Sequence, residues 1–241
     1  MAKKGGSNRL KRISAPPQWD IPRKAHRFAI KPSPGPYSLE NSYSLGVALR
    51  DLLDLVMNRR EAERVLYNSE ILVDGVARQD ASLPVGLFNV IEVPKEGLAY
   101  RLVPSPDGLS ARNVSKEEAR LKLCRVRSKS KIAGGHIQYG FHDGRSIRND
   151  TLSLSPGDSV LLKVPEQSVL SSIKLTKGSL GLIISGDRAG ETGKITDVKK
   201  GTASREKMVT ISLSDGEEEL PARMIFPVGA SDAPAIGVQV Q

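Results

Sequence analysis

Few residues of this chain have the types and spacing that catalysis needs. Residues 186–194, Gly-Asp-Arg-Ala-Gly-Glu-Thr-Gly-Lys, invite comparison with a nucleotide-binding P-loop. That motif requires glycine where Arg188 stands and Ser or Thr where Ile195 stands, so we expect the glycines to serve a loop between strands instead. His142 and Asp143 are adjacent and do not naturally share the hydrogen bond of an acid–base pair. We therefore expect that the protein is not an enzyme.

The histidines and the single cysteine do not have the spacing of a metal site. His26, His136 and His142 lie far apart and have no cluster of cysteines or carboxylates beside them. Cys124 has no second thiol with which to pair, which fits a reducing compartment, and we expect it to be a small buried hydrophobe. The sequence therefore predicts no metal and no cofactor.

Clustered positive charge indicates a different chemistry, which is contact with phosphate. The chain has 241 residues, a net charge of +9 and a pI of about 9.7. Residues 1–40 carry a net charge of +7 and residues 120–148 another +7, so the remaining residues sum to −5. Charge scattered only for solubility would not leave the rest of the chain acidic. We therefore predict an RNA partner, with a solvated basic surface as the alternative.

The residues predicted to bind RNA come from the N-terminal segment, a central helix, an alternating strand and two turns. They are Lys3, Lys4, Arg9, Lys11, Arg12, Trp19, Arg23, Lys24, Arg27, Lys31, Arg59, Arg60, Arg64, Arg125, Arg127, Lys129, Lys131, Arg145, Arg148, Arg188 and Lys194. The N-terminal segment, residues 1–41, is rich in proline and cannot bury enough apolar surface to fold alone. We predict a tail that becomes ordered on RNA, anchored by Trp19 and Phe28; the alternative is a flexible tail without a specific role.

Two predicted helices and a hairpin follow this tail. Apolar residues recur at steps of three and four over 45–56, which predicts an amphipathic helix. Asn58 has the spacing of an N-cap before a second helix that runs to about Tyr67 and exposes its arginines. Asp74-Gly75 between two β-prone runs predicts a tight hairpin turn.

The middle of the chain contains a ladder of cations at every second position. Arg125, Arg127, Lys129 and Lys131 would all point to one face of an extended strand. An edge strand that uses charge against aggregation is the alternative, but four cations without an intervening acid favour phosphate contact. Strands and glycine turns over 174–229 predict a strongly bent barrel.

Several stretches resemble known RNA-binding families. Residues 43–93 resemble the small helix-hairpin module of bacterial ribosomal protein four, which also occurs in some pseudouridine synthases and tyrosyl-tRNA synthetases. Residues 178–199 look like a KOW motif. With residues 10–19, 122–126 and 142–148, the chain from about Asn8 to Gly229 resembles the four-e family of the archaeal and eukaryotic small ribosomal subunit.

The resemblance implies an α+β, mostly β architecture in five parts. These are a basic N-terminal extension (1–41), a helix-hairpin RNA-binding module (42–94), a central β domain (95–173), a C-terminal SH3-like KOW barrel (174–229) and a C-terminal tail (230–241). The chain also departs from the family pattern, which usually has His where Tyr37 stands.

The implied function is that of a structural constituent of the small ribosomal subunit that binds ribosomal RNA and supports assembly and translation. Its partners would be small-subunit ribosomal RNA and neighbouring ribosomal proteins, with no small-molecule substrate. We expect it in the cytoplasm, in the ribosome, and not in a membrane, because no apolar run approaches the ~20 residues of a membrane helix. An RNA-modifying enzyme and a KOW-type factor that cycles on and off are the alternatives.

Overall fold

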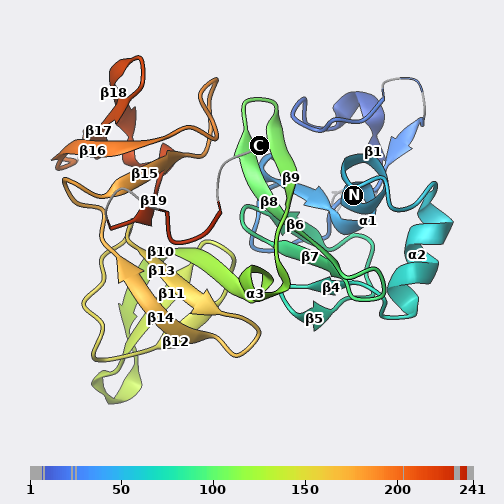
Figure 1. Ribbon diagram of the computed structural model, residues 1–241, viewed down its shortest axis with the longest axis horizontal. Helices are drawn as coiled ribbons and strands as arrows, with labels where there is room; N and C mark the ends of the chain where they lie inside the picture. Colours follow the sequence, from blue (N-terminus) through green and yellow to red (C-terminus); the bar gives the residue numbers. More distant parts are fainter. Residues whose placement is uncertain are drawn as a thin grey trace, which may run out of the picture.

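The computed structural model describes residues 7, 9–22, 24, 26–202, 204–230 and 234–237, which form a mostly β, α+β fold. Three five-stranded antiparallel sheets dominate it, and two short strand pairs accompany them. In Figure 1 the first sheet and the first two helices lie on the right, the second sheet at lower left and the third at upper left. Within the described residues, no helix combines the length and apolar character needed to cross a membrane.

The first sheet has the strand order β5-β4-β7-β8-β9 and carries the helices on one side. Its core contains buried residues from the helices and strands, including Leu45, Leu49, Leu66 and Ile91. A short pair, β3 with β6, lies beside it. The elements are β3 (Ser42–Ser44), α1 (Leu45–Val47), a π-helical turn (Ala48–Leu52), α2 (Arg59–Tyr67), β4 (Leu72–Val73), β5 (Val76–Ala77), β6 (Pro84–Gly86), β7 (Val90–Val93), β8 (Leu98–Ser105) and β9 (Gly108–Asn113).

The first predicted helix is shorter than its apolar periodicity indicates. After one α-helical turn the chain widens, and the Leu53 amide donates to the Ala48 carbonyl, five residues back, at 2.9 Å. Asp54 then adopts a positive φ of 51°, which ends the helix. The prediction of a continuous helix to Val56 is therefore wrong, although the predicted inward face is buried through Leu45 and Leu49.

The second helix and the hairpin agree with the sequence. The Asn58 side chain accepts a hydrogen bond from the Glu61 amide at 3.0 Å, so it is the predicted N-cap of α2. Asp74 and Gly75 have φ values of 51° and 75° in the turn between β4 and β5. Positive φ at both central residues is the conformation of a type I′ hairpin turn, which confirms the Asp-Gly prediction.

The N-terminal segment packs onto the first sheet, contrary to the prediction of a tail ordered only by RNA. β1 (Leu10–Lys11) pairs with β2 (Phe28–Ala29). The Trp19 ring stacks on Tyr43 with centroids 5.5 Å apart, and its indole N–H donates to the Ser42 carbonyl at 2.9 Å. The segment cannot bury enough surface alone, but the neighbouring core supplies the missing partners. Two short 3₁₀ turns, Arg12–Ser14 and Leu39–Asn41, complete it.

The second sheet has the order β12-β11-β10-β13-β14 and its own core around Cys124, Tyr139 and Leu162. Cys124 is buried, as predicted. A short helix, α3, precedes the long strand β10. The elements are α3 (Lys116–Ala119), β10 (Leu121–Lys131), a 3₁₀ turn (Ala133–Gly135), β11 (Ile137–Phe141), β12 (Ser146–Arg148), β13 (Ser159–Lys163) and β14 (Ser168–Ile173).

The third sheet has the order β18-β17-β16-β15-β19 and surrounds a core that includes Ile183, Ile195 and Ile211. Residues 186–190 connect β15 to β16, so the glycines of this segment serve a loop between strands, as predicted. A Cβ on Gly190 would lie 2.8 Å from the Pro104 carbonyl, where this loop meets the β8–β9 hairpin. The elements are β15 (Leu180–Ile183), β16 (Thr192–Lys199), β17 (Met208–Leu213), β18 (Gly216–Pro221), a 3₁₀ turn (Ala222–Met224) and β19 (Ile225–Gly229).

Candidate nucleic-acid interface

The predicted basic ladder lies on β10, which changes from buried to exposed along its length. Residues 122–124 are buried, whereas the described residues from Arg127 to Lys131 are all exposed. The pairing with β11 shifts between Val126 and Ser128, so Arg127 is the extra residue of a β-bulge. A bulge breaks the alternation of faces, and the prediction that all four cations share one face is therefore wrong.

The exposed half of the ladder forms a projecting basic hairpin with β11. Lys129 lies over the Tyr139 ring at 5.5 Å and its ammonium donates to the Leu154 carbonyl at 3.1 Å. Arg127 and Lys131 make no ion pair with the described residues, which leaves their charges open to a partner. We define these three cations, Arg127, Lys129 and Lys131, as the basic hairpin.

Arg125 instead joins the second sheet to the third. Its guanidinium donates to the Arg223 and Ile225 carbonyls at 2.9 and 3.2 Å and lies 5.5 Å from the Phe226 ring centroid. Burial and, to a lesser degree, the charge of Arg127 lower the pKa of Arg125. One guanidinium nitrogen makes both hydrogen bonds, so Arg125 joins the two sheets, and its predicted phosphate contact stays a prediction.

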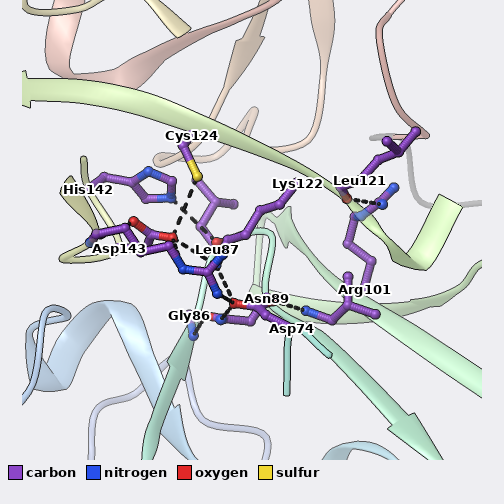
Figure 2. Close-up of polar contacts among 12 residues, drawn as sticks. Asp74, Gly86, Leu87, Asn89, Arg101, Leu121, Lys122, Cys124, His142 and Asp143 are labelled. Atoms are coloured by element: carbon purple, nitrogen blue, oxygen red, sulfur yellow. Dashed lines mark hydrogen bonds and ion pairs between the residues drawn. The ribbon is translucent and has the colours of Figure 1, made fainter. Parts of the chain in front are cut away.

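Arg145 belongs to a buried ionic cluster, which we define as Asp74, Lys122, Asp143 and Arg145. One oxygen of Asp74 accepts from the Lys122 ammonium at 2.7 Å and from Arg145 at 2.9 Å. Lys122 also lies 3.1 Å from Asp143, and Arg145 lies 3.4 Å from the same carboxylate. Figure 2 shows Lys122 of β10 facing the carboxylates of Asp74 and Asp143. Arg145 contacts the same two carboxylates.

Further hydrogen bonds hold Asp74 in the cluster, whereas Nη1 of Arg145 is buried without a hydrogen-bond partner among the described residues. The Asp74 carboxylate also accepts from the Asn89 side chain at 2.8 Å and, through its other oxygen, from the Val90 amide at 3.0 Å. Burial alone would lower the pKa of Lys122, but Asp74 and its other neighbours raise it above the usual lysine value. Burial would raise the pKa of Asp143, yet Lys122 and the surrounding donors keep it below its usual value. Lys122 and Asp143 are therefore expected to be charged.

His142 borders the cluster and is held neutral. Its Nδ1 accepts a hydrogen bond from the Arg125 amide at 3.1 Å, and its ring packs edge-on against Phe226. Burial lowers the pKa of His142 to about 4, more than the neighbouring Asp143 raises it. A neutral imidazole that accepts a main-chain hydrogen bond is a structural group here. Among the described residues, no group of three or more His, Cys, Asp and Glu side chains has an arrangement that could hold a metal ion.

The outer face of α2 presents unpaired cations. Arg60 and Arg64 are exposed, one turn apart, and their side chains form no ion pair with the described residues. Arg59 is different, because it forms an ion pair with Glu63 at 2.7 Å. Arg60 and Arg64 therefore lie side by side on α2, as predicted, whereas Glu63 partly neutralises the charge of Arg59.

The N-terminal cations divide into exposed and internally bonded residues. Arg12 donates to the Ile21 carbonyl at 2.9 Å and Lys31 to the Ser7 carbonyl at 2.6 Å. Trp19 is 2% exposed, so its ring is held in the core and cannot stack on RNA in this conformation, which corrects that prediction. The exposed cations are Arg9, Lys11, Lys24 and Arg27. Lys3, Lys4 and Arg23 lie outside the described residues.

The remaining predicted cations lie on the second and third sheets. Arg148 is exposed at the end of β12, and Lys194 is exposed on β16. Arg188 lies 3.7 Å from Glu218 and 4.0 Å from Asp215, so neighbouring acids offset its charge. These acids make the surroundings of Arg188 less positive than those of the basic hairpin.

Two buried cations were missed by reasoning from the sequence. Arg101 on β8 is fully buried and donates to the Glu118 and Leu121 carbonyls at 2.8 and 2.9 Å. Lys122 was counted only as part of the central positive charge. Each lies between apolar residues within a strand, and that position is the signal that could have indicated burial.

Comparisons with known proteins agree with this arrangement. A profile of ribosomal family S4e matches residues 96–169, and a profile of the RS4NT (NUC023) domain matches residues 4–40. Small ribosomal subunit protein eS4 of Methanothermobacter thermautotrophicus is 36% identical over 97% of both chains, and that of Methanosphaera stadtmanae is 37% identical over 99% of this chain and 98% of its own.

A solved structure also indicates similarity to ribosomal protein S4e. The crystal structure of 30S ribosomal protein S4e from Thermoplasma acidophilum superposes with a TM-score of 0.69 at 31% identity, covering 80% of this chain and 98% of that one. Profiles, near full-length sequence identity and fold all indicate one assignment. This chain belongs to the ribosomal protein family S4e.

Proposed function

We propose that this protein is a structural component of the small ribosomal subunit, which binds ribosomal RNA and supports subunit assembly and translation. The observation that carries the proposal is near full-length similarity to small ribosomal subunit proteins eS4. The family consists of ribosomal structural proteins and not of enzymes. An enzymatic role for the helix-hairpin module would need a catalytic domain in addition to it.

The exposed cations support an RNA contact made mainly through phosphates. The basic hairpin, the Arg60–Arg64 pair and the N-terminal cations lie on three different parts of the fold. Neutralising phosphate at separate points favours recognition of folded RNA by its shape rather than by base sequence. The protein would thus bridge RNA segments, with neighbouring ribosomal proteins as its other partners.

The finer architecture is part of the same proposal. We assign residues 42–94 as a helix-hairpin RNA-binding module, 95–173 as a central β domain and 174–229 as an SH3-like KOW barrel, preceded by a basic extension and followed by a tail. The capped helix α2, followed by the Asp74-Gly75 hairpin, supports the first assignment. The five antiparallel strands with pairing shifts in β15 and β16, which bend a sheet, support the last.

Sedimentation tests the proposed function. The tagged protein should co-sediment with small subunits through a sucrose gradient at high salt. Recovery mainly in the free fraction would contradict a resident ribosomal protein and favour a factor that binds and leaves. Washing with increasing salt separates the two, because a factor that binds and leaves should dissociate at lower salt than a protein bound at several points of the particle.

A further inference from the structure

We infer that the outer face of the β1–β2 pair is a stacking platform for an unpaired RNA base, with Phe28 as the contacting ring. The inference rests on the proposed function and specifies the kind of RNA that the N-terminal segment contacts. It assigns this segment to single-stranded nucleotides rather than to a double helix.

The register of the two strands places Phe28 beside a cation. Leu10 pairs with Ala29, and Lys11 pairs with Phe28. Leu10 and Ala29 are buried in the core of the first sheet, so the alternation of side chains turns Lys11 and Phe28 outward. Residues directly opposite in an antiparallel pair have neighbouring side chains on one face.

The Phe28 ring is accessible and lies close to two cations. It is 42% exposed, the Arg27 guanidinium lies over the ring at 5.5 Å from its centroid, and Lys11 is its partner on the opposite strand. Neither Lys11 nor Arg27 forms an ion pair with the described residues of the chain. An exposed ring with adjacent cations can stack on a base through its π-face while the cations neutralise the flanking phosphates.

A second exposed apolar residue lies at the end of β1. Ile13 is 92% exposed on the 3₁₀ turn that follows Lys11. Between residues 7 and 31 the sequence has a single acid, Asp20, against seven Lys and Arg residues. This positive charge favours an anionic partner, and the exposed apolar groups favour one that also offers a flat apolar surface. An unpaired nucleotide combines both properties.

The shape of RNA explains why the base must be unpaired. In a double helix the faces of the bases are covered by their neighbours, and side chains reach mainly phosphates and hydroxyls. A ring on an outward-facing strand pair can cover the face of a base only where that base is splayed from the stack. Duplex RNA would therefore use the cations of the segment but not Phe28.

Binding of the full chain to two RNAs tests the platform. One is a 12-nucleotide single-stranded oligo(A), and the other is a six-base-pair duplex with the same number of nucleotides. Phe28→Leu keeps an apolar side chain but removes the π-face, so it should weaken oligo(A) binding by roughly tenfold or more and leave duplex binding unchanged. Phe28→Tyr should bind both RNAs like the natural protein.

Leu170→Ala is the matched control, because Leu170 is 53% exposed on β14, a strand without charged residues. Leu170→Ala should leave the affinities for oligo(A) and for the duplex unchanged. The platform is overturned if Phe28→Leu weakens both RNAs equally or neither, or if the natural protein binds only the duplex. If Phe28→Leu lowers the melting temperature, Phe28→Tyr and Phe28→Trp provide the test instead, because both keep an aromatic ring. Each should bind oligo(A) at least as tightly as the natural protein, and weaker binding by both would overturn the platform.

The two proposals fail in different ways. Loss of co-sedimentation with small subunits would contradict the ribosomal function itself. Retained co-sedimentation with unchanged oligo(A) binding by Phe28→Leu would contradict the platform alone.

Discussion

At the scale of single residues, the ionic cluster is the most consequential arrangement. Lys122 is fully buried, and its charge is tolerated because Asp74 and Asp143 contact it directly. Removing one member of a buried pair leaves a charge without a partner, which costs more than the pair itself contributes. The cluster is therefore expected to be more sensitive to single than to paired substitutions.

Replacing Asp74 tests this expectation. Asp74→Ala should lower the free energy of unfolding by about 3–5 kcal/mol, measured by urea denaturation, because Lys122 then lacks its 2.7 Å partner. Asp187→Ala, which removes an exposed aspartate from the β15–β16 loop, should change stability by less than about 0.5 kcal/mol. Adding Lys122→Met to Asp74→Ala should recover part of the loss, and a double variant less stable than Asp74→Ala would refute the pairing argument.

His142 makes a separate prediction about pH. Its pKa is about 4 in the folded protein and about 6.5 when unfolded, so the unfolded state binds more protons between these values. Stability is fully present above about pH 6.5 and falls as the pH decreases towards 4, by on the order of 3 kcal/mol. Urea denaturation at several pH values should show this slope, and His142→Gln should reduce it. An equal slope in that variant would assign it to other groups, such as Asp143, whose lowered pKa acts in the same direction further into acid.

At the scale of elements, the sequence predicts most securely what depends on neighbouring residues. The N-cap at Asn58 and the Asp74-Gly75 turn are set by local hydrogen bonds and backbone conformation, and both were predicted correctly. The π-helical end of the first helix and the bulge at Arg127 depend on packing against other segments, so periodicity alone could not indicate them. The same holds for Trp19, whose partner Tyr43 lies in the next module.

The exposed face of α2 provides a prediction for RNA binding. Arg60→Glu with Arg64→Glu should weaken binding to small-subunit RNA at least tenfold in a filter-binding assay, since two phosphate contacts become repulsions. Thermal melting should be nearly unchanged, because neither side chain forms an ion pair within the described part of the chain. Lys95→Glu with Lys163→Glu changes the net charge equally at two exposed ion pairs and is the control. Equal weakening in both doubles would indicate a general charge effect.

The basic hairpin should contribute to the salt dependence of binding. Replacing Arg127, Lys129 and Lys131 by glutamine should lower the slope of log K against log salt by roughly one unit for each phosphate that is no longer neutralised. Arg125 is left out of this set because its donors bind carbonyls of the third sheet. An unchanged slope in the triple variant would show that the hairpin faces solvent in the complex.

At the scale of the whole molecule, polar contacts join the three sheets. The ionic cluster connects the Asp74 turn of the first sheet to β10 of the second, and Arg125 connects β10 to the chain around β19 in the third. Gly190 brings the β15–β16 loop against Pro104 of the first sheet. These contacts favour a fixed arrangement of the three sheets, which the proposed binding to several RNA segments would require.

Arg125 tests the coupling between sheets. Arg125→Ala should increase hydrogen exchange in β15–β19 more than in the first sheet, because it removes both carbonyl contacts and the Phe226 contact. Arg223→Ala removes an exposed side chain but keeps the acceptor carbonyl, so it should leave exchange in β15–β19 unchanged. A uniform increase over all three sheets in Arg125→Ala would contradict a local coupling role.

The packing of the N-terminal segment has a consequence for biosynthesis. Trp19 and Ile21 belong to a core that is completed by residues as distant as Leu102. At translation rates of about 5–20 residues per second, the segment emerges roughly 4–16 s before that core can form. During this interval Trp19 lacks the residues that later bury it, while the cations of the segment are already exposed. A chaperone or an RNA that covers the segment would therefore act before the core of the first sheet is complete.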